Sequence, residues 1–227
     1  MSTTKSPVSM TSQPVGILAA LLASAVLACG QRFEITPLVG ARAGGTMDVQ
    51  REDQPGQVRA QLDDSITYGV AAGVRFFDDT GCADCSVVEF RWMRQKTNLG
   101  LKQGSPVPTP LTTFGRTDVT QDHYLADFTY EWRIDEARAV RPFIFVSLGA
   151  ARLSTPVSAN TRFTFGLGTG VKIFPQTHWG IRFHVEYLPT VMHAEVQRIA
   201  CVGGCVVALS GGVMNQFEVG VGPAFRF

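Results

Sequence analysis

The clearest pattern in the chain is the stretch from Gln121 to Ile134, QDHYLADFTYEWRI, in which apolar and polar residues alternate. Alternation with a period of two places one set of side chains on each face of a β-strand. The sequence therefore predicts a strand with two chemically different faces. One face carries Tyr124, Ala126, Phe128, Tyr130, Trp132 and Ile134, and the other carries His123, Asp127, Thr129, Glu131 and Arg133.

Seven further segments repeat this alternation and predict eight strands in all. They cover residues 33–45, 65–77, 86–97, 141–153, 161–174, 178–188 and 213–227. Their polar faces mix glycine with charges of both signs, which suits the narrow interior of a small barrel where charges must neutralise one another. Aromatic residues near the strand ends are typical of the two interfaces of a membrane. We therefore expect the apolar faces to contact lipid.

An open sheet cannot cross a membrane, because each unpaired backbone group in hydrocarbon costs several kcal/mol. The predicted fold class is all-β: an eight-stranded antiparallel up-and-down transmembrane β-barrel over residues 30–227, preceded by a cleaved signal peptide over residues 1–29. Connections 46–64, 98–120 and 189–212 are long and are expected as outer loops, together with the shorter 154–160. The short connections 78–85, 135–140 and 175–177 are expected as periplasmic turns.

The N-terminus has the pattern of an export signal. Lys5 lies in a polar leader, and an uncharged apolar stretch from Val15 to Leu27 follows it, too short for a membrane-spanning helix. The sequence Val26-Leu-Ala-Cys29 is also similar to the lipoprotein processing site, with Leu27 where a smaller residue is preferred. Cleavage by signal peptidase I and lipidation of Cys29 therefore both stay open.

The other cysteines form two close pairs, Cys82 with Cys85 and Cys201 with Cys205. Pairs with this spacing can be redox centres or halves of a zinc site. A turn sequence precedes Cys82 rather than the βαβ unit that a redox centre prefers, and the predicted topology separates the two pairs to opposite ends of the barrel. Two local disulfides are therefore the favoured interpretation, in keeping with an oxidising destination.

The last strand carries the most specific resemblance. In Gln216-Phe-Glu-Val-Gly-Val-Gly-Pro-Ala-Phe-Arg-Phe227, aromatic residues occupy the last and third-last positions, and apolar residues alternate back from them. Over residues 30–227 the chain resembles the small bacterial outer-membrane β-barrel domains. That resemblance implies a location in the bacterial outer membrane and an assembly signal formed by Phe217, Phe225 and Phe227, read by the barrel-assembly machinery. Pro223 departs from strand chemistry and predicts a bulge or a gap in pairing near the barrel closure.

The polar faces hold the candidate site residues. We predict that these residues form a polar network in the lumen: Glu89, Arg91, His123, Asp127, Glu131, Arg133, Arg182, His184 and Glu186. A histidine beside a carboxylate can act as a base with its orienting group. Buried charges in a narrow lumen must pair in any case, so no catalytic, cofactor or metal site is predicted. Gly166-Leu-Gly-Thr-Gly170 is similar to a phosphate loop, but no helix follows it, and inward-facing glycines of a strand explain it better.

We expect a non-enzymatic outer-membrane protein, monomeric, with a structural role or with outer loops that bind a ligand. A net charge of +1 gives no reason to expect nucleic acid, and the expected partners are outer-membrane lipids and the assembly machinery. A narrow channel for small or apolar solutes is the alternative, and a lipid-modifying enzyme is a third hypothesis. The sequence identifies no ligand or solute.

Overall fold

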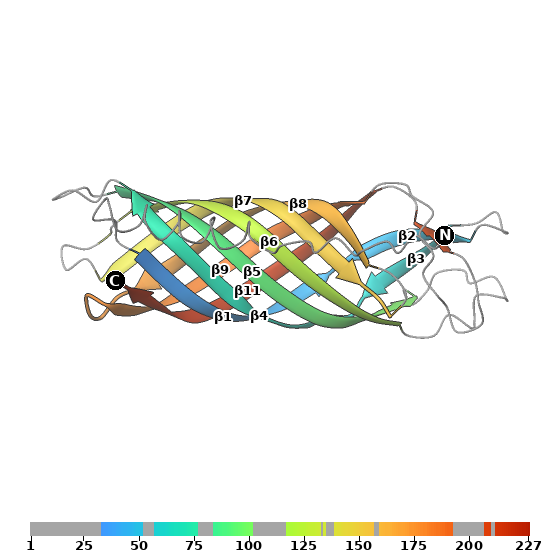
Figure 1. The fold of residues 1–227 in the computed structure, drawn as a ribbon, viewed down its shortest axis with the longest axis horizontal. Helices are drawn as coiled ribbons and strands as arrows, with labels where there is room; N and C mark the ends of the chain where they lie inside the picture. Colours follow the sequence, from blue (N-terminus) through green and yellow to red (C-terminus); the bar gives the residue numbers. More distant parts are fainter. Residues whose placement is uncertain are drawn as a thin grey trace, which may run out of the picture. The chain divides into compact units, whose positions relative to one another are not determined.

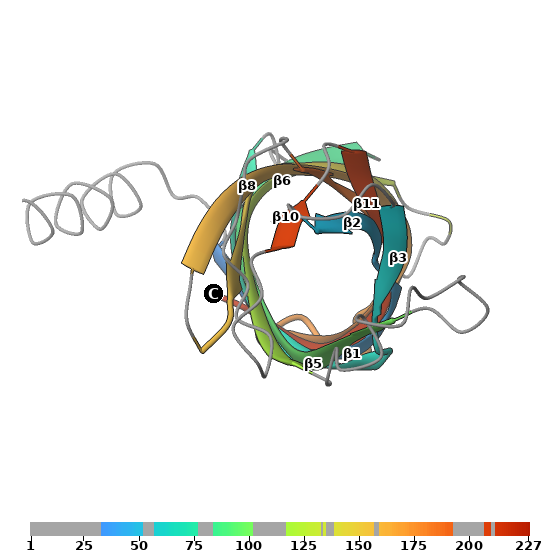
Figure 2. The ribbon, with the colours of Figure 1, turned by 90° about the vertical axis from the view of Figure 1, so that its right-hand side faces the viewer.

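The computed structural model contains the eight predicted strands, and they form a closed antiparallel barrel. It describes residues 33–51, 57–76, 84–101, 117–132, 134, 139–156, 159–192, 207–209 and 212–227. The barrel strands are β1 (Phe33–Gly44), β4 (Ser65–Phe76), β5 (Asp84–Leu101), β6 (Thr117–Trp132), β7 (Val140–Ser154), β8 (Ala159–Ile173), β9 (Trp179–Met192) and β11 (Gly212–Arg226). Seen along its axis, the barrel wall is a continuous ring (Figure 2). No helix in the described part of the chain is long and apolar enough to cross a membrane.

The first and last barrel strands pair with each other, as a barrel without edges requires. β1 lies antiparallel to β11, with Glu34 opposite Arg226 and Arg42 opposite Glu218. At the end of this seam, the backbones of Phe33 and Phe227 exchange two hydrogen bonds, with N···O distances of 3.3 and 2.9 Å. Phe227 therefore closes the barrel against the start of the first strand.

The seam between β1 and β11 has a gap in its pairing at Pro223. Paired residues occur at Ile35–Phe225 and again at Val39–Val221, with the same register on both sides of the gap. That register sets Pro223 opposite Pro37, at a position where two residues normally exchange both of their ladder hydrogen bonds. Because neither proline has an N–H, both of these hydrogen bonds are lost. Of the two predicted possibilities, the structure has a gap and not a bulge.

The two faces of the wall have the predicted orientation. Outward side chains are apolar and exposed, for example Leu167 at 62% and Phe128 at 53%, whereas Arg91 and Arg182 inside the barrel are 0% exposed. A soluble protein has the opposite arrangement, with charges on its surface and apolar residues inside. The outward face therefore suits hydrocarbon, and the structure is that of a transmembrane barrel.

Three strands lie where the sequence predicted only outer loops. β2 (Thr46–Arg51) and β3 (Gln57–Leu62) pair as a hairpin, β3 pairs with the outer end of β5, and β10 (Val207–Leu209) pairs with β2. The prediction of plain loops over 46–64 and 189–212 was wrong at these residues. β2 follows β1 directly, because Gly44 and Gly45 have φ of 91° and 94° and let the chain turn at the rim. These strands lie at the end of the barrel opposite the C-terminus, which is the outer end if the termini are periplasmic (Figure 1).

Candidate functional site in the barrel lumen

The structure places the described members of the predicted lumen network on the inward face of the wall. Eight of the nine predicted side chains are buried in the barrel: Glu89, Arg91, His123, Asp127, Glu131, Arg182, His184 and Glu186. Arg133, the ninth, lies outside the described residues. Alternate residues of a strand point to opposite faces of the wall. Since the apolar residues face the lipid, the polar residues between them face the lumen.

Toward the end of the barrel that carries the C-terminus, Lys172 is the centre of the network. Its Nζ lies 2.6 Å from a carboxylate oxygen of Glu34, 2.6 Å from one of Glu131 and 3.1 Å from one of Glu89. These three carboxylates come from β1, β6 and β5, whereas Lys172 is on β8, so one ammonium group joins four parts of the wall. Lys172 donates hydrogen bonds to Glu89 and Glu131, and it is in ion-pair contact with Glu34.

Arginine side chains complete the neutralisation of these three carboxylates. Arg182 NH1 is 2.6 Å from Glu89 Oε2, Arg75 NH2 is 3.0 Å from Glu131 Oε2, and Arg226 Nε is 3.0 Å from Glu34 Oε2. Arg182 also lies over the inward ring of Phe143, with 4.9 Å from the guanidinium carbon to the ring centroid. Stacking of this kind lets a cation be buried beside an apolar ring.

Halfway along the lumen, Arg91 forms several polar contacts. It forms a fork with Asp127 on the neighbouring strand β6, with Nε–Oδ2 at 2.7 Å and NH2–Oδ1 at 3.3 Å. It also donates to Glu186 Oε1 at 2.8 Å and to Ser147 Oγ at 3.1 Å. Glu186 is on β9, which faces β5 across the ring in the order of the strands. The side chains of Arg91 and Glu186 therefore bridge the whole width of the lumen.

Arg42 and Glu218 form the pair toward the outer end. Arg42 Nε donates to Glu218 Oε2 at 2.8 Å, and Arg42 NH1 donates to His123 Nδ1 at 2.6 Å. Above them, Gln121 on β6 donates to Gln216 on β11 at 3.1 Å. Cross-lumen contacts thus occur at successive heights along the barrel.

His184, Glu186 and Glu218 are the group of described residues that could hold a metal ion, since one ligand atom from each lies within 4.8 Å of the others. The geometry favours a different role. Glu186 and Glu218 already accept hydrogen bonds from Arg91 and Arg42, and His184 Nε2 is 3.7 Å from Glu218 Oε1. A metal ion would have to bind beside two guanidinium cations, so the residues present suit an ion-pair network better than a metal site.

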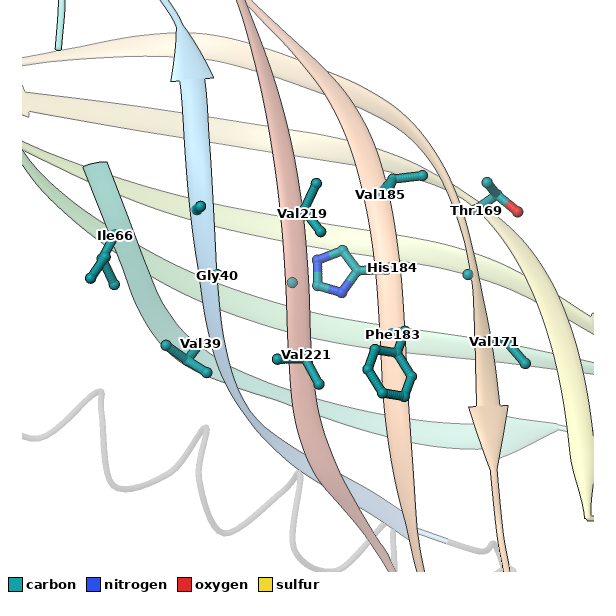
Figure 3. Close-up of a pocket in the computed structure, with 13 residues that line it drawn as sticks. Val39, Gly40, Ile66, Thr169, Val171, Phe183, His184, Val185, Val219 and Val221 are labelled. Atoms are coloured by element: carbon teal, nitrogen blue, oxygen red, sulfur yellow. The ribbon is translucent and has the colours of Figure 1, made fainter. Parts of the chain in front are cut away.

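A shallow hollow of about 790 Å³ lies on the lipid-facing side of β1, β11, β9 and β8. Its lining is mainly aliphatic and includes Val39, Val185 and Val219 (Figure 3). His184 lies behind this wall, and a Cβ added at Gly220 would overlap its ring. The glycine therefore makes room for the imidazole inside the barrel, and the hollow offers hydrocarbon contacts and little polar chemistry.

The predicted network did not include Arg42, Lys172 and Glu218, although each is buried on the inward face of its strand. The available signal was their position on the polar side of an alternating strand. Their ion-pair partners are on other strands and could be identified only from the closed barrel. The inward position of the glycines from Gly166 to Gly170 on β8 is confirmed. Outside the described residues lie Cys29, Cys82, Cys201 and Cys205, and only the backbone of Cys85 is described, so the disulfides and the lipidation stay predictions.

The structure defines the class to which the protein belongs: a small eight-stranded β-barrel of the bacterial outer membrane, with an apolar outer band and a charged interior. Known structures share this fold. Neisserial surface protein A is similar with a TM-score of 0.51 and 14% identity, over 86% of this chain and 97% of that protein.

Two other structures are similar at lower TM-scores. The outer membrane protease OmpT from Escherichia coli has a TM-score of 0.49 at 5% identity, over 86% of this chain and 97% of that one. Ail, the attachment invasion locus protein of Yersinia pestis, has a TM-score of 0.39 at 14% identity, over 86% and 99%. No protein-family model matches the sequence, and no curated protein does so. The likeness concerns the fold and assigns no activity.

Proposed function

We propose that this protein is a non-enzymatic outer-membrane barrel with a closed interior, whose role is structural or is carried by its outer end. The observation that carries the proposal is the set of side-chain bridges between opposite strands. Arg91 and Glu186 link β5 to β9, Arg182 and Glu89 link the same strands at a second height, and Gln121 bonds Gln216 between β6 and β11. An eight-stranded barrel is narrow enough for such side chains to fill it.

The outer end supports a role outside the membrane. β3 pairs with the outer end of β5, and β2 and β10 continue this sheet inside the outline of the barrel wall, at its outer mouth (Figure 2). A sheet at the mouth of the barrel can hold loops for contact with a ligand, and binding residues are often found on loops positioned by a rigid scaffold.

Catalysis by the lumen histidines is the less favoured hypothesis. Arg42 donates to His123 Nδ1, so the lone pair that a general base would use is already engaged. His184 is enclosed among Arg91, Glu218 and the barrel wall and is 2% exposed. A lipid substrate would have no direct access to either imidazole.

A narrow water path through the lumen is the second candidate function, and one observation favours it. Several buried polar atoms have no hydrogen-bond partner among the described residues, including Arg182 Nε, His184 Nδ1 and Glu218 Oε1. Polar atoms of this kind are positions where water binds. A continuous file of such positions would conduct small solutes, whereas isolated ones would not.

Conductance in planar lipid bilayers distinguishes these two functions. We expect no single-channel steps from the purified, folded protein. The double variant Arg91→Ala/Glu186→Ala removes one complete bridge across the lumen and is expected to stay closed while Arg182–Glu89 and Gln121–Gln216 remain; removing these two bridges as well is expected to let small ions pass. Arg94→Ala, which removes an arginine on the outer surface, is the matched control and is expected to stay closed. Reproducible steps from the unmodified protein would contradict the closed interior.

A further inference from the structure

Among the described side chains, charges on the lipid-facing surface lie on one side of the barrel. Among barrel-strand residues with described side chains, the outward-facing charges are on β5, β6 and β7 alone. They lie at the outer ends of these strands, beyond the apolar residues of the same face. They are Arg94, Lys96, Asp118, Asp122 and Arg152. At the same end of β8, β9, β11 and β1 the described outward residues are neutral. This group is called the outer charged row below.

The outer charged row lies directly above the outer aromatic girdle. Asp122 is paired in register with Arg94 on β5 and with Arg152 on β7. One step toward the periplasm on the same face, Trp92 is paired with Tyr124. From Tyr124 to Trp132 the apolar face of β6 is roughly nine residues long, close to the length that a tilted strand needs to cross hydrocarbon. The row therefore lies at the level of the lipid headgroups in the outer leaflet.

Arg94 is held in place on this surface. Its Nε lies 2.6 Å from Asp122 Oδ1 and its NH2 3.0 Å from Asp122 Oδ2, and its guanidinium carbon is 5.4 Å from the centroid of the Trp92 ring. Trp92 Nε1 also donates to Asp122 Oδ1, at 3.3 Å. A guanidinium fixed by a carboxylate and an aromatic ring loses little freedom when it binds a further acceptor.

The row has more cations than carboxylates. Asp122 forms an ion pair with Arg94 and is opposite Arg152 in the strand register. Lys96 is the next outward-facing residue of β5 after Arg94, and it is opposite Thr120. Arg152, Lys96 and Asp118 are exposed and Arg94 is partly exposed, whereas Asp122 is almost fully buried, so three cations stand against one exposed carboxylate. The surface that reaches the headgroups is therefore mainly cationic, and guanidinium groups match the geometry of phosphate oxygens.

We propose that the outer charged row on β5–β7 is a binding site for a phosphate group of an anionic lipid in the outer leaflet. Arg152 and the outer edge of Arg94 supply the N–H donors, Lys96 adds a charge above them, and the rings of Trp92 and Tyr124 contact the lipid just below its headgroup. Lipid bound here would stay on one side of the barrel, because the described outward side chains of β8, β9, β11 and β1 include no cation at this height.

Native mass spectrometry of the full folded protein, with a bisphosphorylated lipid A as probe, tests the site. We expect retained lipid on the unmodified protein. The double variant Arg94→Gln/Arg152→Gln should bind at least about tenfold more weakly, since it removes the charged hydrogen-bond donors to the phosphate. Arg162→Gln is the matched control: Arg162 lies near the same rim on β8 but faces inward, so its loss should leave lipid binding unchanged. Heat-dependent gel migration of each variant checks that the barrel has folded.

Three results would overturn the proposal. The first is equal retention of the same lipid after its phosphates have been removed, which would show binding by the acyl chains alone. The second is unchanged affinity in the folded double variant. The third is saturable binding of inorganic phosphate that displaces the lipid, which would assign the site to a free anion instead of a lipid headgroup.

Discussion

Replacing Lys172 with methionine tests whether the lumen network holds the barrel together. Lys172 is 0% exposed, and its Nζ contacts carboxylates of Glu34, Glu89 and Glu131 on three other strands. Methionine fills a similar volume but leaves these buried carboxylates without their shared cation. Removing one partner of a buried ion pair costs about 3–5 kcal/mol. Arginines still contact each carboxylate, so we expect the free energy of unfolding to fall by about 3 kcal/mol, the lower end of that range.

The assay is equilibrium unfolding in urea of the protein inserted in lipid vesicles, followed by tryptophan fluorescence. Lys96→Met is the matched control, because Lys96 is an exposed lysine on the outer surface, and its loss should change the free energy of unfolding by less than about 1 kcal/mol. Adding Glu131→Gln to Lys172→Met removes one of the carboxylates left without the lysine and should recover part of the lost stability. The reasoning is refuted if Lys172→Met and Lys96→Met unfold at the same urea concentration.

Three further predictions concern the closure between β1 and β11. Gly222→Val should prevent closure, because a Cβ at Gly222 would overlap the Pro37 carbonyl oxygen, and the folded form should disappear from unheated gels; normal folding would contradict the close approach. Pro223→Val supplies a backbone N–H opposite Pro37 and should raise the free energy of unfolding by about 0.5–1.5 kcal/mol in urea titrations, whereas a decrease would show that the gap is required. Deleting Phe227 removes the backbone pair with Phe33 and should lower the amount of folded barrel in outer-membrane fractions; an unchanged amount would argue against its role in assembly.

The wall of the barrel could be predicted from the sequence because strand alternation is a local property. Successive side chains of a strand point to opposite faces whatever the strand pairs with, so Phe128 and Asp127 are assigned to lipid and lumen without knowledge of any neighbour. The same reasoning placed Arg42 and Lys172 inside. It could not say which charges meet, because their partners are on strands far along the chain.

The outer strands were missed for a similar reason. β10 has three residues, Val207–Leu209, and is a strand only because β2 lies beside it. So short a segment carries too few residues for an alternation to be recognised. Its pairing depends on the turn at Gly44 and Gly45, which directs the chain beyond the end of β1.

The sequence by itself determined that the chain forms eight two-faced strands with most charges inside and most aromatic residues outside. Only the tertiary structure decided that Arg91 reaches Glu186 across the lumen, that Lys172 joins three carboxylates, and that Pro37 faces Pro223 at the seam. The physical reason is that alternation is set residue by residue, whereas these contacts depend on the relative stagger of strands, which is fixed only when the barrel closes.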